Sequence, residues 1–347
     1  MTERSHDQGG GRGPVSSREL DERIASPSEA VVESIRDCEG DFAVLGANGK
    51  MGFHLCLMLK QALKRLGRTD RVRAVSRFSD AGSCSEFEAI GCEVVAAELS
   101  HAPSVEQLPE AENVFHLAGV KFGTSLEPIL LETMNVEMPK LGAERFRDSS
   151  IVALSTGCVY SFVAPETGGS REEDEVNPPG AYARSCLGRE RAFSEPGTKA
   201  ALVRLNYSTD LRYGVLVDLA LKILADEPVD VSMGFVNVIW QGDAIRQIVQ
   251  TLAHASSPPF VINVAGAEIL RVRDLALGLG RRLGREVELA GEEEPTAWLS
   301  DTGKARKLFG EPEVEVGQMM DWVVDWIGRG GEVLGKPTHF QVRDGKF

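Results

Sequence analysis

A glycine-rich loop that directly follows a short apolar run constrains the fold of this chain more than any other feature. The run Phe42–Leu45 leads into the loop GANGKMG, residues 46–52, and apolar residues then recur at helical spacing from Met51 to Leu66. Small residues between a strand and a helix let the backbone approach a pyrophosphate, whose charge the helix N-terminus stabilises. The alternative is an ordinary tight turn in a chain with 36 glycines. The placement favours dinucleotide binding by Gly46, Asn48, Gly49, Lys50, Met51 and Gly52.

Short apolar runs continue to alternate with helical patterns beyond this loop. They are Val72–Val75, Glu93–Ala96, Asn113–Leu117, Ile151–Leu154, Ala200–Leu205 and, later, Phe260–Val264. Such alternation predicts a parallel sheet covered by helices on both faces. We therefore expect an α/β fold in which a doubly wound Rossmann domain carries a smaller C-terminal substrate-binding lobe. The domain would comprise residues 41–205 and 236–266, and the lobe residues 206–235 and 267–330.

The two ends of the chain differ in composition from the segments between them. Residues 1–17 are rich in glycine, serine and charge, which predicts a disordered tail. Residues 18–40 are expected to hold an N-terminal helix that begins with Ser26 as its N-cap and Pro27 at its first position. Residues 331–347 have few apolar side chains and are predicted to form a C-terminal tail.

The net charge of the chain restricts the classes of molecule that it is expected to bind. The chain has 52 acidic against 38 basic residues, a net charge of −14, which argues against nucleic acid or an anionic membrane as partner. No run approaches the ~20 apolar residues that span a bilayer, and the N-terminus lacks the apolar core of a signal peptide. The six cysteines show no CxxC spacing and the histidines are scattered, so no metal site or disulfide framework is predicted. These patterns indicate a cytoplasmic protein that acts on a small molecule.

The end of the second predicted strand bears on the choice of dinucleotide. Ser76 and Arg77 stand there, where domains that select NAD usually place an acidic residue to hold the ribose hydroxyls. A hydroxyl and a guanidinium suit a 2′-phosphate instead. We therefore expect NADP as the cofactor, with NAD as the alternative if Arg77 only stacks on the adenine or is a surface charge.

Several ordered motifs resemble the extended short-chain dehydrogenase/reductases, the NAD(P)-dependent sugar epimerase/dehydratase family, over residues 40 to about 325. Gly46, Gly49 and Gly52 match the family's GxxGxxG spacing. The further matches, in family order, are Glu98-Leu99, His116-Leu117-Ala118-Gly119, Lys121, Asn135-Val136 and the segment LSTGCVY at residues 154–160. The resemblance implies that the cofactor is also bound by Glu98, Leu99, Leu117, Ala118, Gly119, Lys121, Asn135, Ser155 and Tyr182.

The resemblance also implies a pair of catalytic residues. Thr156 falls at the position of the catalytic hydroxyl, and Tyr182, 26 residues further on, at that of the catalytic tyrosine. Tyr182 would take the proton of a substrate hydroxyl whose oxygen Thr156 also holds, while hydride passes to the nicotinamide. Whether the outcome is epimerisation, dehydration or simple oxidation is left open.

One departure from the family concerns its Tyr-x-x-x-Lys signature, in which Cys186 stands in place of the lysine. Residues i and i+4 share a helix face, so an ammonium there would stabilise the tyrosine phenolate, and a thiol does not. Arg189 at i+7, or the positive ring of oxidised nicotinamide, would compensate for the missing positive charge of the lysine. Otherwise the chain is a catalytically impaired dinucleotide-binding sensor or partner protein. We favour the enzyme because Thr156 and Tyr182 keep their catalytic spacing.

Polar and aromatic residues cluster after the predicted strand that ends at Leu205, and they are typical of a pocket rim. Asn206, Tyr207 and Arg212 are the candidates there, together with Lys121 and Thr156, for binding a carbohydrate-like substrate. An ordinary polar loop is the alternative. Relatives often pair through helices that flank the catalytic tyrosine, so a homodimer is expected by analogy.

Overall fold

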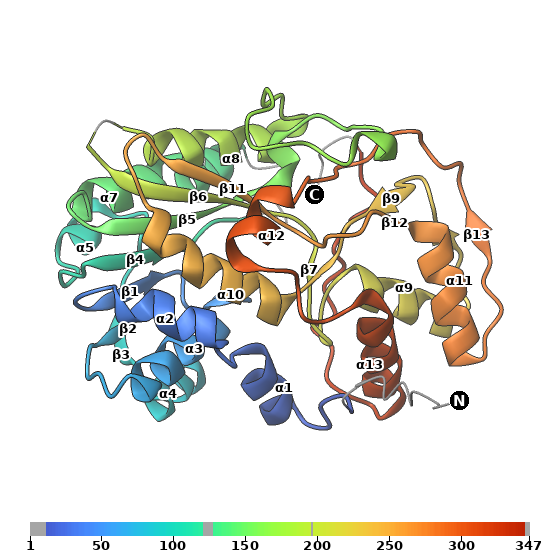
Figure 1. The fold of residues 1–347 in the computed structure, drawn as a ribbon, viewed down its shortest axis with the longest axis horizontal. Coiled ribbons are helices and arrows are strands. Elements are labelled where there is room, and N and C mark those ends of the chain that lie inside the picture. The colour runs from blue at the N-terminus through green and yellow to red at the C-terminus, as the bar shows by residue number, and fades with distance from the viewer. Residues whose placement is uncertain (1–11, 121–127, 196, 344–347) are drawn as a thin grey trace, which may run out of the picture.

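A computed structural model describes residues 12–120, 128–195 and 197–343 of the chain. Its centre is a seven-stranded parallel sheet with the order β11-β6-β5-β4-β1-β2-β3 (Figure 1). The strands are β1 (Phe42–Leu45), β2 (Val72–Ser76), β3 (Glu93–Ala96), β4 (Asn113–His116), β5 (Ser150–Thr156), β6 (Lys199–Leu205) and β11 (Phe260–Val264). The predicted doubly wound α/β fold is confirmed. The order reverses between β1 and β4, and such a switch point opens a crevice at the carboxyl ends of the strands.

Alternate side chains of β1 enter two separate apolar cores. Phe42 and Val44 face the core that includes α2 (Glu29–Arg36), α3 (Gly52–Arg65) and α10 (Gln241–Thr251). Ala43 and Leu45 face the core that includes α5 (Ala102–Glu106) and α7 (Met138–Arg145). A strand buried on both faces is apolar without interruption, and this explains the short continuous runs in the sequence.

The segments between the strands complete the nucleotide-binding half of the molecule. They hold α4 (Ala81–Ala89), α6 (Pro128–Glu132), a π-helical turn at Thr133–Glu137 and α8 (Gly180–Ala192), the helix that carries Tyr182. Short 3-10 turns occur at Gly157–Val159, Pro165–Thr167 and Leu252–His254. Among the described residues, no helix is both long and apolar enough to cross a membrane.

The predicted N-terminal helix is present as α2, but its N-cap is Ser28 and not Ser26, and a further helix precedes it. Helix α1 (Ser17–Ile24) is capped by Ser16, and α2 is capped by Ser28, whose Oγ accepts a hydrogen bond from the Val31 amide. Ser26 lies in the link between the two helices, where its carbonyl oxygen accepts a hydrogen bond from Arg246. Ser28, two residues after Ser26, is the N-cap because its side chain accepts a hydrogen bond from a backbone amide of the first turn that would otherwise be unpaired.

The smaller lobe lies at one side of the sheet (Figure 1). Its helices are α9 (Val215–Leu224), α11 (Val272–Leu283) and α13 (Val316–Gly328), and its two-residue strands pair as β8 (Val229–Asp230) with β13 (Leu289–Ala290) and β9 (Phe235–Val236) with β12 (Leu270–Arg271). Strands β7 (Ser208–Thr209) and β10 (Ile239–Trp240) pair with each other, and α12 (Gly303–Phe309) follows later in the chain.

The described part of the predicted C-terminal tail contains no helix or strand, yet it is packed against the smaller lobe. The backbone amide and hydroxyl of Thr338 both donate to Asp218, at 2.7 and 2.6 Å. Phe340 is only 6% exposed. The Leu334 amide donates to the carbonyl of Arg212. Residues 331–343 therefore form part of the lobe.

Candidate active site

The crevice at the carboxyl ends of the strands contains two adjoining cavities, one of about 440 Å³ and one of about 230 Å³. Both are lined by Gly46, Gly49, Leu117 and Gly119. The crevice thus continues on either side of the glycine loop. An elongated ligand lying across the loop would place its two ends in the two cavities.

The glycine loop is shaped so that its backbone stays open to the crevice. Gly46 has φ +84°, and a Cβ there would lie 2.7 Å from the backbone of Ala118. A Cβ on Gly52 would overlap the carbonyl oxygen of Ala47. These contacts leave no room for side chains at the two positions, and the loop opens directly into α3. The residues present therefore fit a dinucleotide, whose pyrophosphate takes amide hydrogens at a helix start.

The smaller cavity matches the adenosine side of such a ligand. Of the residues predicted for the cofactor, those lining it are Gly46, Asn48, Gly49, Ser76, Arg77, Glu98, Leu99, Leu117, Ala118 and Gly119. Arg77 lies 4.0 Å from a carboxylate oxygen of Glu98, and their side chains are 72% and 42% exposed. Burial raises the pKa of Glu98, but hydrogen bonds from Ser100 and the charge of Arg77 bring it below its usual value. A cation and an anion therefore stand together where a ribose phosphate would bind.

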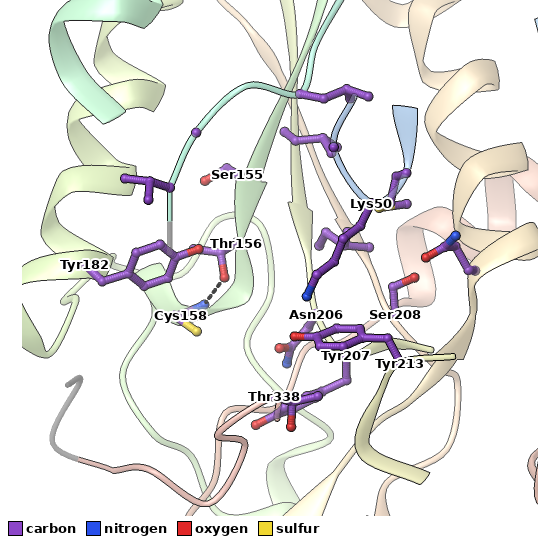
Figure 2. Close-up of a pocket in the computed structure, with 18 of the residues that line it drawn as sticks. Lys50, Ser155, Thr156, Cys158, Tyr182, Asn206, Tyr207, Ser208, Tyr213 and Thr338 are labelled. Carbon is purple, nitrogen blue, oxygen red and sulfur yellow. Dashed lines mark hydrogen bonds between the residues drawn. The ribbon is translucent and has the colours of Figure 1, made fainter. Parts of the chain in front are cut away.

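The larger cavity brings the two predicted catalytic residues together. The hydroxyl of Tyr182 points toward Thr156 (Figure 2), and both line the cavity with Ser155, Lys50 and Met51. The Thr156 hydroxyl oxygen accepts a hydrogen bond from the Cys158 amide at 3.2 Å. Burial raises the pKa of Tyr182 well above its usual value, and the nearby thiols raise it further.

Cys186 does not reach this cavity. It is fully buried behind Tyr182, in a small cluster with Val159 and Tyr160. Burial raises the pKa of its thiol, so the group is neutral at physiological pH. The structure therefore gives Cys186 a packing position beside the tyrosine, without contact to the space where a substrate would lie.

The substrate side of the larger cavity is mainly aromatic and uncharged. Asn206 and Tyr207 lie on it as predicted, and the other lining residues are Ser208, Tyr213, Val215, Gln241, Trp298, Thr338 and Phe340. The Asn206 amide donates to the Trp298 carbonyl at 3.1 Å. Lys50 extends from the glycine loop so that its ammonium lies 3.1 Å from the centre of the Tyr213 ring (Figure 2).

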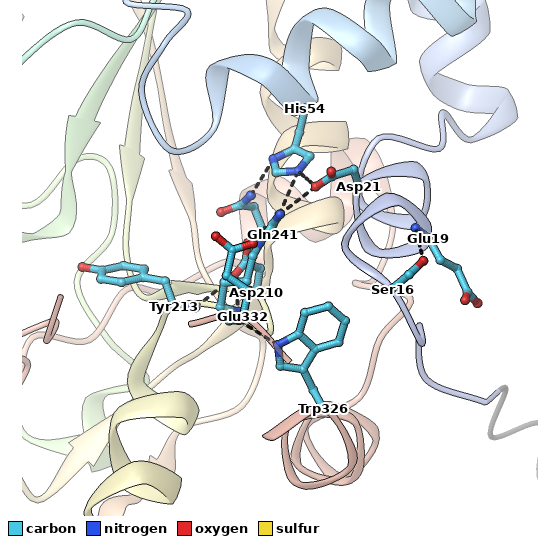
Figure 3. A network of polar contacts seen from close by, with 10 residues as sticks. Ser16, Glu19, Asp21, His54, Asp210, Tyr213, Gln241, Trp326 and Glu332 are labelled. Atoms are coloured by element: carbon cyan, nitrogen blue, oxygen red, sulfur yellow. Dashed lines mark hydrogen bonds and ion pairs between the residues drawn. The ribbon is translucent and has the colours of Figure 1, made fainter. Parts of the chain in front are cut away.

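The predicted role of Arg212 in substrate binding needs correction, because its side chain is not part of the cavity wall. It donates to Asp21 on α1 at 2.8 Å and to Asp210 at 3.3 Å, and His54 contacts the same Asp21 oxygen at 2.8 Å (Figure 3). The side chain of Arg212 is paired with two carboxylates, and it therefore connects α1 to the loop that follows β7. In the sequence Arg212 stands in a polar cluster, and this position is equally compatible with a structural ion pair and with substrate binding.

One further predicted residue, Asn135, stands apart from the cavities. Asn135 is fully buried, and its amide group bonds both backbone polar groups of Val120, the hydroxyl of Ser185 and the guanidinium of Arg189. It therefore supports the cavity wall from behind. Lys121 lies outside the described residues.

The sequence analysis missed part of the cavity wall. Thr338 and Phe340 come from the segment predicted to be a tail, and Trp298 from an irregular stretch without any motif. Phe340 is an aromatic residue in a polar terminal segment, but this signal does not indicate where the segment packs.

The strand order, the glycine loop and the crevice together define a doubly wound dinucleotide-binding protein. Residues 42–195 match the model of the NAD dependent epimerase/dehydratase family. The family resemblance predicted from the sequence is thus confirmed, and the matched region, from β1 to just beyond α8, includes the glycine loop, Thr156 and Tyr182. No curated protein sequence gives a significant match to the chain.

Many solved structures share this fold, and three of them are described below. A UDP-galactose 4-epimerase is 21% identical with a TM-score of 0.65, covering 84% of this chain and 99% of its own. The UDP-glucose 4-epimerase of Thermotoga maritima, solved with UDP-glucose, is 19% identical with a TM-score of 0.67 and covers the same shares. The enzyme WbmG of Bordetella bronchiseptica, solved with NAD and UDP, is 15% identical with a TM-score of 0.69, covering 87% and 99%. At these identities the likeness establishes a common fold.

Proposed function

We propose that this protein oxidises a hydroxyl-bearing carbon of a sugar or sugar derivative by hydride transfer, as an NAD(P)-dependent epimerase, dehydratase or dehydrogenase. The observation that carries the proposal is the meeting of Tyr182 and Thr156 in a cavity that also exposes the glycine loop. A proton acceptor, a hydroxyl donor and a dinucleotide cradle in one space are what such a reaction needs. The family match supports a carbohydrate-like substrate, as do structural neighbours that were solved with UDP-glucuronic acid or UDP-glucose.

The chain's own groups have distinct roles in this proposal. Because the Thr156 oxygen accepts the Cys158 amide, its own proton is available to donate to the substrate oxygen. Tyr182 takes the hydroxyl proton from the same oxygen as general base. When bound, the nicotinamide dinucleotide supplies the acceptor for the hydride. The rings of Tyr207 and Tyr213 line the space where a sugar ring would lie.

The adenosine cavity supports NADP as the dinucleotide, with NAD as the alternative, because Arg77 lines it. Structural neighbours have been solved with NAD. Pairing into a homodimer through the helices that flank Tyr182 stays a prediction, which light scattering in solution would test.

The proposal is tested by turnover assays with a panel of free sugars and nucleotide sugars. Replacing Tyr182→Phe removes the proton acceptor and should lower kcat about 10²–10⁴-fold, as expected for the loss of general base catalysis. Dinucleotide affinity, measured by calorimetry, should stay within about twofold, since the phenyl ring still fills the same volume. Undiminished turnover in this variant would refute the assignment.

The lysine position supports a second candidate, a dinucleotide-binding sensor or partner protein with impaired catalysis, because Cys186 supplies no cation. In that case the wild-type chain would bind dinucleotide but turn over none of the panel, and Cys186→Lys would stay equally inert. Turnover by the wild-type chain would exclude this candidate.

A further inference from the structure

Arg189 is a buried cation in the wall of the catalytic cavity. It lies two turns beyond Tyr182 on α8, is 7% exposed and lines the cavity with Tyr182 and Thr156. Its Nη1 donates to the Leu154 carbonyl at 2.9 Å and its Nη2 to the side chain of Asn135. A Cβ added to Gly119 would overlap Nη2, so the guanidinium packs flat against the backbone of the cofactor crevice.

Among the residues that the structure describes, no carboxylate neutralises the charge of Arg189. Within the described ranges, none lies at ion-pair distance from it, and its two hydrogen-bond acceptors are neutral oxygens. Its buried Nε has no partner. Arg204, equally buried on β6, shows the contrast, because it forms two bonds to Glu190 at 3.0 and 2.8 Å. Burying a cation without a counter-ion is energetically unfavourable, and this indicates that the positive field of Arg189 has a function.

Three groups around Arg189 respond to this field. Burial and the thiols of Cys186 and Cys158 raise the pKa of Tyr182, whereas Arg189 lowers it. Burial likewise raises the pKa of the Cys186 thiol, against the effect of Arg189. His116 has its pKa lowered to about 3 by burial and by Arg189. The guanidinium therefore lines the same cavity as the tyrosine and favours its charged form.

We propose that Arg189 replaces the missing lysine as the positioning residue that stabilises the phenolate of Tyr182. The inference rests on the proposed function. In the oxidation, the phenolate oxygen takes the substrate hydroxyl proton, the C–H bond breaks, and its electron pair leaves with the hydrogen as hydride to the nicotinamide dinucleotide. The substrate gains a C=O bond and is oxidised, and the dinucleotide is reduced. A lysine at position 186 would face Arg189 as a second buried cation, which explains why a neutral thiol stands there.

The phenolate can be followed without turnover. The chain has only four tyrosines, so full replacement with a ring-fluorinated tyrosine gives four fluorine NMR signals, and Tyr182→Phe identifies one of them. Fluorination lowers the phenol pKa into an accessible range. Arg189→Met should raise the titration midpoint of that signal by about one pH unit or more, because it removes a nearby cation. Arg189→Lys should keep it within about 0.3 unit, since the charge is retained.

Arg184→Met is the matched control, because Arg184 lies on the same helix and is exposed. It should leave the midpoint unchanged. If Arg189→Met does not fold, Asn135→Asp places a carboxylate against the same guanidinium and should raise the midpoint in its stead. The rising limb of kcat/KM against pH should move by the same amount. A midpoint unchanged in folded Arg189→Met or Asn135→Asp overturns the inference, whereas inactivity of the wild-type chain with a shifted midpoint would overturn only the proposed function.

Discussion

The two ends of the crevice are built from different kinds of contact. The cofactor end combines the backbone of one loop, residues 46–52, with residues at the carboxyl ends of β2, β3 and β4. The substrate end is formed by side chains that range from Asn206 to Phe340 along the chain. The difference shows that a short sequence motif can identify a binding surface that is formed by backbone. A surface that is formed by side chains from distant parts of the chain has no such motif.

The substrate end also depends on both termini. Asp21 on the N-terminal helix pairs with Arg212, and Asp210 accepts the backbone amides of Arg212 and Tyr213 at 2.7 and 2.9 Å. On the other side, Thr338 fixes the C-terminal segment through Asp218. The walls that face a substrate are thus held by contacts that span almost the whole described chain.

Gly52→Ala should produce the largest effect on dinucleotide affinity and should act on the cofactor end. The added methyl would overlap the Ala47 carbonyl oxygen, a backbone atom that cannot move without opening the loop. We expect dinucleotide affinity, measured by calorimetry, to fall at least about 100-fold, the loss that follows from about 2.7 kcal/mol of distortion. Gly317→Ala, also in the first turn of a helix but with open space around it, should leave affinity unchanged. Equal tolerance of both substitutions would contradict the proposed loop packing.

Phe340→Ala tests the substrate end. The ring is nearly buried, and its removal should lower the free energy of unfolding by about 3 kcal/mol, at the low end for a buried phenylalanine because one side faces a cavity. The KM for substrate should rise while the dissociation constant of the dinucleotide stays the same. Leu334→Ala, on the same segment but 40% exposed, is the control and should change the free energy of unfolding by less than about 1 kcal/mol. If dinucleotide binding weakened with Phe340→Ala, the two ends would not be independent.

Arg77→Ala should give the smallest effect, since the side chain is 72% exposed. We expect NADP affinity to fall about tenfold, or about 1.4 kcal/mol, with NAD affinity unchanged, because only NADP carries the 2′-phosphate. Glu98→Gln should act in the opposite direction by removing the anion beside Arg77. Equal weakening of NAD and NADP in the Arg77 variant would show that this arginine does not select the dinucleotide.

The residues that the sequence located well are those whose role is set by near neighbours in the chain. Phe42–Leu45, Glu93–Ala96 and Phe260–Val264 coincide with strands of the sheet. For Phe42–Leu45 the apolar run records burial on both faces of the sheet, and the glycine spacing records a backbone conformation. The family resemblance added the positions of Thr156 and Tyr182, which the fold brings into one cavity.

Other assignments failed or were missed because they depend on packing partners far away in the chain. Nothing within residues 26–28 shows that Ser28 caps the helix and that Ser26 meets Arg246 instead. Arg212 has the same local appearance whether it faces a substrate or Asp21.

By itself the sequence predicted the doubly wound sheet and the dinucleotide loop, since these follow from short-range periodicity and spacing, and a family resemblance implied the catalytic tyrosine and threonine. Only the tertiary structure decided that Phe340 lines the substrate side and that Arg189, rather than residue 186, places a cation beside Tyr182. The physical reason is that burial and electric fields depend on distance in space, and the elements that meet there are separated by up to hundreds of residues of chain.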